Sequence, residues 1–139
     1  CEKALIFLQR AREKDPRYEG LAVELAFSYN CLNEFQKAED ILEEEVKTNS
    51  SNAYVNKEYI FTLAKNKKIE KAVKQFKQSV KNEIDKIYNA ENCYNIAQYF
   101  YNEKDKNNFN IWYKELSNWP NENEDITKYA KLMYSEINK

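Results

Sequence analysis

The sequence predicts an all-α protein, and three observations carry that prediction. Gly occurs once and Pro twice in 139 residues, which leaves few residues for hairpins or phosphate-binding loops. Apolar residues recur at helical spacing along most of the chain. Ala4, Ala38 and Ala72 lie 34 residues apart, and each opens a similar amphipathic run. A repeat of helical units is therefore expected.

Residues 1–18 are expected to form one helix, with Leu8 and Ala11 following Ala4 on one face and Asp15-Pro16 ending it. The sequence provides no partner helix for this segment, so we expect the face of Leu5, Leu8 and Ala11 to be uncovered. Either a further repeat precedes it in a longer protein, or the chain self-associates through Leu5 and Leu8.

Residues 19–52 are expected to form two helices, one running from Leu21 to Tyr29 and the other carrying Ala38. Asn33 is the expected N-cap of the second helix, and Gln36 three residues later gives a capping-box-like start. Ser50, Ser51 and Asn52 form the next turn, and residues 53–86 repeat the pattern. Small residues at Ala26, Ala38, Ala72 and Ala97 are expected where two helices cross closely.

This pattern resembles the tetratricopeptide repeat family, whose unit is an antiparallel pair of helices. The resemblance implies a right-handed superhelical solenoid of antiparallel helix pairs, about eight helices in one domain, and its Asp-Pro unit ending matches Asp15-Pro16. The matching positions are Ala22, Leu25, Ala26, Tyr29, Phe35, Ala38, Leu42 and Val46 in one unit, and Asn56, Tyr59, Ile60, Leu63, Ile69, Ala72, Phe76 and Val80 in the next.

The last third of the chain departs from the family pattern. Residues 87–122 are expected to form a divergent repeat, because about three extra residues precede it and bulky Phe109 stands where the family needs a small residue. We therefore expect a wider or tilted unit there. Residues 123–139, with Ile126, Ala130 and Met133, are expected to form a C-terminal capping helix.

The resemblance also implies a concave groove that receives a protein or peptide partner, lined by the first helix of each unit. Phe27 and Phe61 occupy positions where a carboxylate-clamp subclass of the family needs polar residues, so we do not expect binding of a chaperone tail. The candidate groove residues are Phe27, Asn30, Tyr54, Lys57, Phe61, Tyr94, Gln98 and Tyr101, with Val23, Lys65, Lys131 and Tyr134 beside them.

Charge is balanced overall but uneven along the chain. Lys and Arg number 22 and Asp and Glu 23, a net charge of -1, which disfavours general binding of nucleic acid or anionic membranes. An acidic helix at 34–47 is followed by a basic stretch at 65–86. The 34-residue offset predicts ion pairs between stacked units, namely Glu34 with Lys68, Asp40 with Lys74 and Glu43 with Lys77.

Catalysis is not expected. The chain lacks His, and it has no glycine-rich phosphate loop or metal-ligand spacing. The carboxylates of Glu43, Glu44 and Glu45 point around a helix and do not converge. We therefore predict a non-enzyme with no catalytic residue, cofactor or metal. No apolar run is long enough for a membrane span.

Cys1, Cys31 and Cys93 are widely spaced and odd in number, which predicts free thiols and favours a cytoplasmic location. Lipid attachment at Cys1 is the alternative. The favoured function is a non-catalytic scaffold for protein–protein interaction. The alternatives are an RNA-binding helical repeat and an assembly module that uses its N-terminal helix face.

Overall fold

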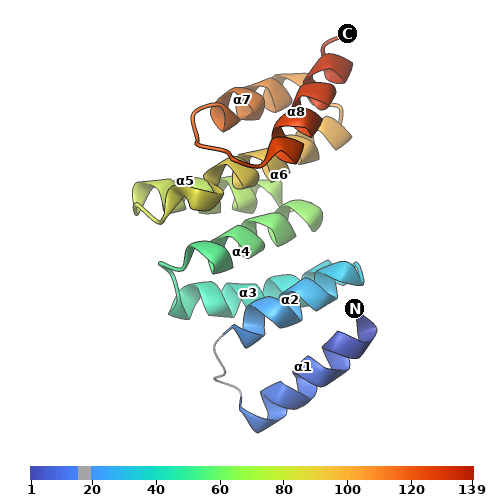
Figure 1. The fold of residues 1–139 in the computed structure, drawn as a ribbon, viewed down its shortest axis with the longest axis vertical. Coiled ribbons are helices and arrows are strands. Elements are labelled where there is room, and N and C mark those ends of the chain that lie inside the picture. The colour runs from blue at the N-terminus through green and yellow to red at the C-terminus, as the bar shows by residue number, and fades with distance from the viewer. Residues whose placement is uncertain (16–19) are drawn as a thin grey trace.

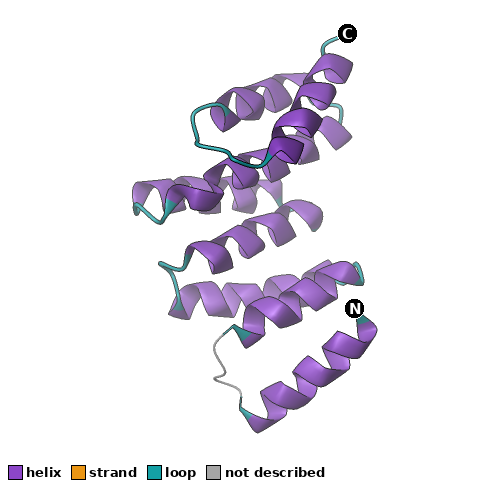
Figure 2. Ribbon diagram, in the orientation of Figure 1, coloured by secondary structure: helices purple, strands orange, loops and turns teal. Residues whose placement is uncertain are grey.

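The computed structural model describes residues 1–15 and 20–139, and all regular secondary structure in that part of the chain is helical (Figure 2). The predicted all-α class with about eight helices is confirmed for these residues. The expected turn at Pro16 lies outside them. The helices are α1 (Glu2–Lys14), α2 (Leu21–Cys31), α3 (Phe35–Thr48), α4 (Ala53–Lys65), α5 (Ile69–Lys81), α6 (Asn89–Asn102), α7 (Lys106–Leu116) and α8 (Glu124–Ile137), with a short 3-10 helix η1 (Lys86–Tyr88) before α6.

The helices follow one another along the long axis of the molecule, from α1 at one end to α7 and α8 at the other (Figure 1). Each helix packs on the next in sequence, and α2 also contacts α4, α4 contacts α6, and α6 contacts α8. We call these four helices the even-helix layer. The extra residues expected before the last pair form η1, which packs against both α4 and α6.

Buried alanines lie in the core between the helices. Ala26, Ala38 and Ala72 are fully buried, and they belong to one apolar cluster that runs from α2 to α8. Small side chains let two helix backbones approach each other, which explains why these positions carry no larger residue. At the position where we expect a wider crossing, the ring of Phe109 is fully buried and lies between Tyr101 and Tyr113, with ring centroids 6.1 and 5.9 Å away.

The turns inside the three helix pairs share one geometry. Asn33, Lys67 and Lys104 each adopt a left-handed backbone conformation, with φ of 60°, 60° and 59°. The next residue donates its N–H to a carbonyl five positions back, as from Glu34 to Tyr29 (2.8 Å). The predicted N-cap role of Asn33 is wrong, because its backbone closes α2 and Glu34 precedes α3. Asn52 does cap α4, since its side chain accepts from the N–H groups of Tyr54 and Val55.

Helix α1 packs on α2 through a small apolar cluster of its own. Leu8 is buried there against Leu21 and Leu25, with Leu5 and Ala11 beside it. The prediction of an uncovered Leu5 and Leu8 face is therefore wrong, because α2 covers it, and the self-association expected through these two residues loses its basis. The exposed apolar side chains of α1 are instead Ile6 and Phe7.

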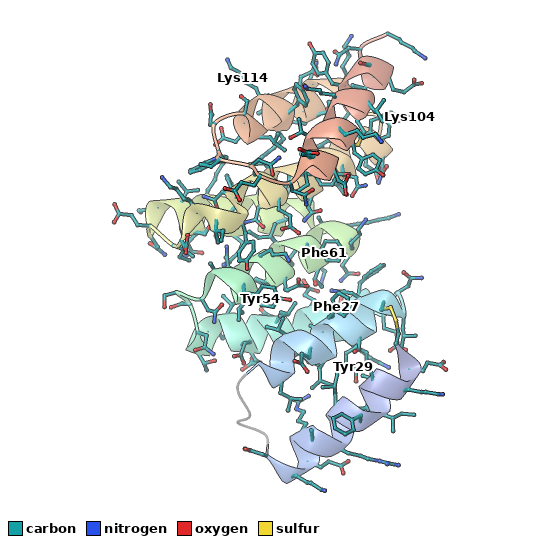
Figure 3. All side chains as sticks on the ribbon, in the orientation of Figure 1. Phe27, Tyr29, Tyr54, Phe61, Lys104 and Lys114 are labelled. Atoms are coloured by element: carbon teal, nitrogen blue, oxygen red, sulfur yellow. A yellow bond between two sulfur atoms is a disulfide. The ribbon has the colours of Figure 1, made fainter. Side chains whose placement is uncertain are left out.

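A disulfide between Cys1 and Cys31 joins the start of α1 to the end of α2 (Figure 3). The prediction that all three cysteines are free is therefore wrong for this pair, whose Cα atoms lie 6.0 Å apart, and the argument for a cytoplasmic location that rested on free thiols fails with it. Spacing in the sequence gave no sign of the pairing, which depends on α1 lying antiparallel to α2. Cys93 is free and buried, and burial raises the pKa of its thiol. No described helix is both long and apolar enough to cross a bilayer.

We predict effects of different size for the same substitution at equivalent repeat positions. Ala72→Leu should lower the free energy of unfolding by about 1–3 kcal/mol, because Ala72 is fully buried and an added isobutyl group overpacks the crossing. Ala4→Leu should change it by less than about 0.5 kcal/mol, since Ala4 is exposed. Urea unfolding followed by circular dichroism measures both. Equal effects of the two substitutions would contradict the assignment of Ala72 to a close crossing.

A second pair of variants tests the left-handed turns. Lys104→Gly should raise the free energy of unfolding by about 1 kcal/mol, because a β-carbon is disfavoured at a φ of 59°. Lys114→Gly, inside α7, should lower it by about 1 kcal/mol, since Gly is a poor helix former. Thermal melting compares the two variants, which remove the same charge. A loss of stability in Lys104→Gly would argue against the turn geometry.

Candidate functional site

The even-helix layer carries exposed aromatic side chains that the core does not use. Phe27 on α2 is 60% exposed and Tyr54 on α4 is 44% exposed, while Phe61 on α4 is half-buried (Figure 3). On α2, the neighbours of Phe27 at Leu25, Ala26 and Ser28 are all buried, so the helix packs its other faces and leaves this ring outside. Tyr129 on α8 is 50% exposed. These exposed rings make the even-helix layer the candidate site.

Tyr54 belongs to a junction of three side chains that we call the tyrosine–lysine junction. The Nζ atom of Lys57 lies 4.9 Å from the ring centroid of Tyr54 and 5.2 Å from that of Tyr88. The two rings are tilted, with centroids 5.9 Å apart. The ammonium also lies 3.3 Å from Glu58 and 3.5 Å from Glu91. Lys57 thus links α4, η1 and α6 and holds Tyr54 in place at the surface.

Burial and charge oppose each other at this junction. Desolvation works against the charged form of Lys57, but attraction to Glu91 and Glu58 outweighs it, and the net pKa of Lys57 is raised. Burial also raises the pKa of Glu58, and the neighbouring ammonium offsets only part of that rise. Lys57 therefore stays protonated at neutral pH. Its charge is already shared between two carboxylates, so it serves as a fixed part of the surface.

Phe61 and Gln98 line one small pocket between the ends of α4 and α6. The pocket has a volume of about 110 Å³, and Ala64, Asn95 and Tyr99 contribute to its walls. Lys65 lies over the Phe61 ring, 5.5 Å from its centroid, and donates to the side-chain oxygen of Gln98 at 3.5 Å. The structure thus brings together two of the predicted groove residues that lie 37 positions apart in the sequence. An apolar ring beside amide groups suits the side chain and backbone of a bound peptide.

Three of the predicted groove residues are engaged inside the fold. Asn30 is 9% exposed and donates to the hydroxyl of Thr62 at 2.8 Å, which ties α2 to α4. Tyr94 is half-buried against the main core. Tyr101 packs on Phe109, on the side of α6 that faces α7. Tyr134, expected beside the groove, stacks on Tyr113 of α7 at 4.6 Å.

The predicted ion pairs between stacked units do not form as expected. Glu34, just before α3, pairs with Lys37 of that helix at 2.5 Å, and Asp40 accepts from Gln36 at 2.9 Å. Glu39, which is 1% exposed, makes the contact between units instead: its carboxylate pairs with Lys68 and with Lys71, the latter at 3.6 Å. The acid that pairs with the next unit is therefore Glu39 and not its neighbour Asp40, because Glu39 faces α5 while Asp40 faces solvent.

Sequence reasoning missed Tyr88, Asn95 and Tyr99 as members of this surface. Tyr88 lies in η1, which interrupts the repeat spacing, so no equivalent position in another unit indicated it. Asn95 and Tyr99 flank Gln98 on one face of α6 and could have been found from helical spacing alone. Both side chains line the pocket of Phe61.

The side chains of this surface carry three kinds of chemical group. Its groups are rings, amides and a lysine held in ion pairs, and no described group of three or more Cys, Asp or Glu side chains is placed to hold a metal ion. The chain matches no protein-family model, and comparison with curated proteins and with solved structures gives no match. Geometry therefore carries the functional assignment.

Proposed function

We propose that the chain is a tetratricopeptide-type module that binds a peptide segment of a partner protein on the even-helix layer, as a non-catalytic scaffold. Under this proposal the helix pairs form a right-handed superhelical solenoid, and α2, α4, α6 and α8 line its concave side. The observation that carries the proposal is the set of exposed rings on this layer, with Phe27, Tyr129 and Tyr54 60%, 50% and 44% exposed.

The proposed mode of binding uses a rigid surface. Tyr54 is held by Lys57 and Tyr88, and Phe61 lies under Lys65. Because these side chains are already ordered, they would lose little conformational entropy when a ligand binds. The rings supply buried area, and Gln98 and Asn95 supply donors and acceptors for an extended backbone. The pocket at Phe61 would take one apolar side chain of the peptide.

RNA binding is the competing assignment for an aromatic surface. Two features favour peptide over RNA: the ammonium of Lys57 is committed to Glu58 and Glu91, and the chain has a net charge of -1. Affinity for RNA falls steeply with salt because phosphate contacts release counterions. An aromatic peptide surface should lose little affinity over the same range.

We predict that peptides selected from a random displayed library for binding to the intact chain lose affinity when the rings are removed. Phe27→Ala and Phe61→Ala should each weaken binding by about tenfold or more, because truncating a central aromatic anchor commonly costs about 2 kcal/mol. Fluorescence anisotropy of the labelled peptides measures the dissociation constant, at low and at high salt.

Phe7→Ala is the matched control, because Phe7 is also an exposed phenylalanine but lies on α1, outside the even-helix layer. Its affinity for the same peptides should equal that of the parent chain. Selected peptides that bind Phe27→Ala and Phe61→Ala as tightly as the parent would refute the assignment of the site. Loss of that binding at high salt would indicate a surface that binds mainly through charge, as RNA binding requires.

A further inference from the structure

A second hollow lies outside the even-helix layer, between α5 and α7. This α5–α7 groove has a volume of about 470 Å³, and Phe100 at the end of α6 completes its lining. Its floor is rigid, because Phe76 and Trp112 are 3% and 7% exposed and meet edge to face with centroids 5.4 Å apart. The remaining lining residues are Val73, Lys77, Val80, Asn108, Ile111 and Glu115.

The rim of the α5–α7 groove exposes apolar side chains. Ile111 is 61% exposed and Val80 is 37% exposed, one on each wall of the groove. Two aliphatic side chains flanking an aromatic floor form an apolar strip between two helices, and Lys77, Asn108 and Glu115 supply the polar part of the lining. Such a strip is the usual receptor for the apolar face of an amphipathic helix.

A row of lysines borders this strip. Beside the α5–α7 groove, a separate hollow of about 480 Å³ runs along the outer face of α5. It shares Val73 and Lys77 with the groove. Lys74, Lys77 and Lys81 line it, and we call them the lysine ridge. None of the three forms an ion pair with any described residue, in contrast to Lys68 and Lys71, which pair with Glu39.

The unpaired charge is local. The chain as a whole carries a net charge of -1, whereas the hollow along α5 has three lysines and one acid, Glu70. The predicted pairs that would have neutralised Lys74 and Lys77 are absent, because Asp40 accepts from Gln36 and the contact between units is made by Glu39. The ridge is thus free to pair with acids from outside the chain.

We propose that the α5–α7 groove docks an acidic amphipathic helix of a partner protein. The apolar face of that helix fills the groove over Phe76 and Trp112, and its carboxylates meet the lysine ridge. Nucleic acid fits this surface less well, because bases stack on exposed rings and Trp112 is buried. This site does not depend on the proposed peptide surface, and together the two sites would let the chain hold two partners.

The test uses a synthetic amphipathic peptide with leucines on one helical face and glutamates on the other. Its matched control has the same leucines with lysines in place of the glutamates. The glutamate peptide should bind the intact chain and perturb the tryptophan fluorescence, since Trp112 lies in the groove floor. The lysine peptide should bind at least about tenfold more weakly.

Two variants locate the binding. Ile111→Ser and the double variant Lys74→Glu/Lys77→Glu should each weaken binding of the glutamate peptide by about tenfold or more. Leu132→Ser is the matched control for Ile111, because Leu132 is 57% exposed on α8, and Lys131→Glu is the control for the lysines. Both controls should bind as the parent does. All of these residues are exposed, and circular dichroism checks that each variant folds.

Three results would overturn the proposal. Equal affinity for the glutamate and lysine peptides, or unchanged affinity in Ile111→Ser, would mean that the groove does not receive an acidic helix. Concentration-dependent self-association of the parent chain that disappears in Ile111→Ser would assign the groove to a second copy of the chain. Sedimentation of the parent and of Ile111→Ser over a range of concentrations measures this.

Discussion

The close crossing of helices at alanine is the constraint on which the rest of the structure depends. Ala26, Ala38 and Ala72 have no exposed surface, and their small side chains allow the backbones of the helices that pack there to approach each other closely. Only then can α2 reach α4 and α4 reach α6 across the intervening helix. The even-helix layer, and every pair of side chains that it brings together, follows from that approach.

Two layers of different chemistry result. The even-helix layer presents rings and amides, because its buried positions are filled by residues such as Ile60 and Ile96 and its outer positions carry Phe27, Tyr54 and Gln98. On α5 the outer positions carry lysines instead. Glu39 joins the first two units electrostatically, since it is almost wholly buried and is paired with two lysines of the next unit. An uncompensated carboxylate at that depth would be strongly destabilising.

The periodicity of the sequence predicted the helices well, because a helix that buries one face needs apolar residues at regular intervals. It predicted less where the answer depends on the direction of a single side chain. The ion pair between units is made by Glu39 where Asp40 was expected. Asn33, the expected N-cap of α3, instead ends α2 in a left-handed conformation. The covering of Leu8 and the pairing of Cys1 with Cys31 depend on how α1 lies against α2, which a segment without a full repeat unit does not encode.

The residues predicted for the candidate site fall into two groups, those at the surface and those used in packing. Helical spacing and the family resemblance selected Phe27, Tyr54, Phe61 and Gln98, which the structure places on neighbouring helices with exposed or pocket-lining side chains. The same reasoning selected Asn30 and Tyr101, which serve packing instead. Sequence spacing tells which helix carries a residue, but a turn of a few tens of degrees about the helix axis decides between solvent and the next helix.

The most direct test of this account is the footprint of a library-selected peptide on the isotope-labelled chain, measured as chemical-shift changes in nuclear magnetic resonance spectra. The account predicts that Phe27 of α2, Tyr54 and Phe61 of α4 and Gln98 of α6 shift together on titration, with one dissociation constant. Shifts confined to a single helix, or found on α5 and α7 without the even-helix layer, would contradict it.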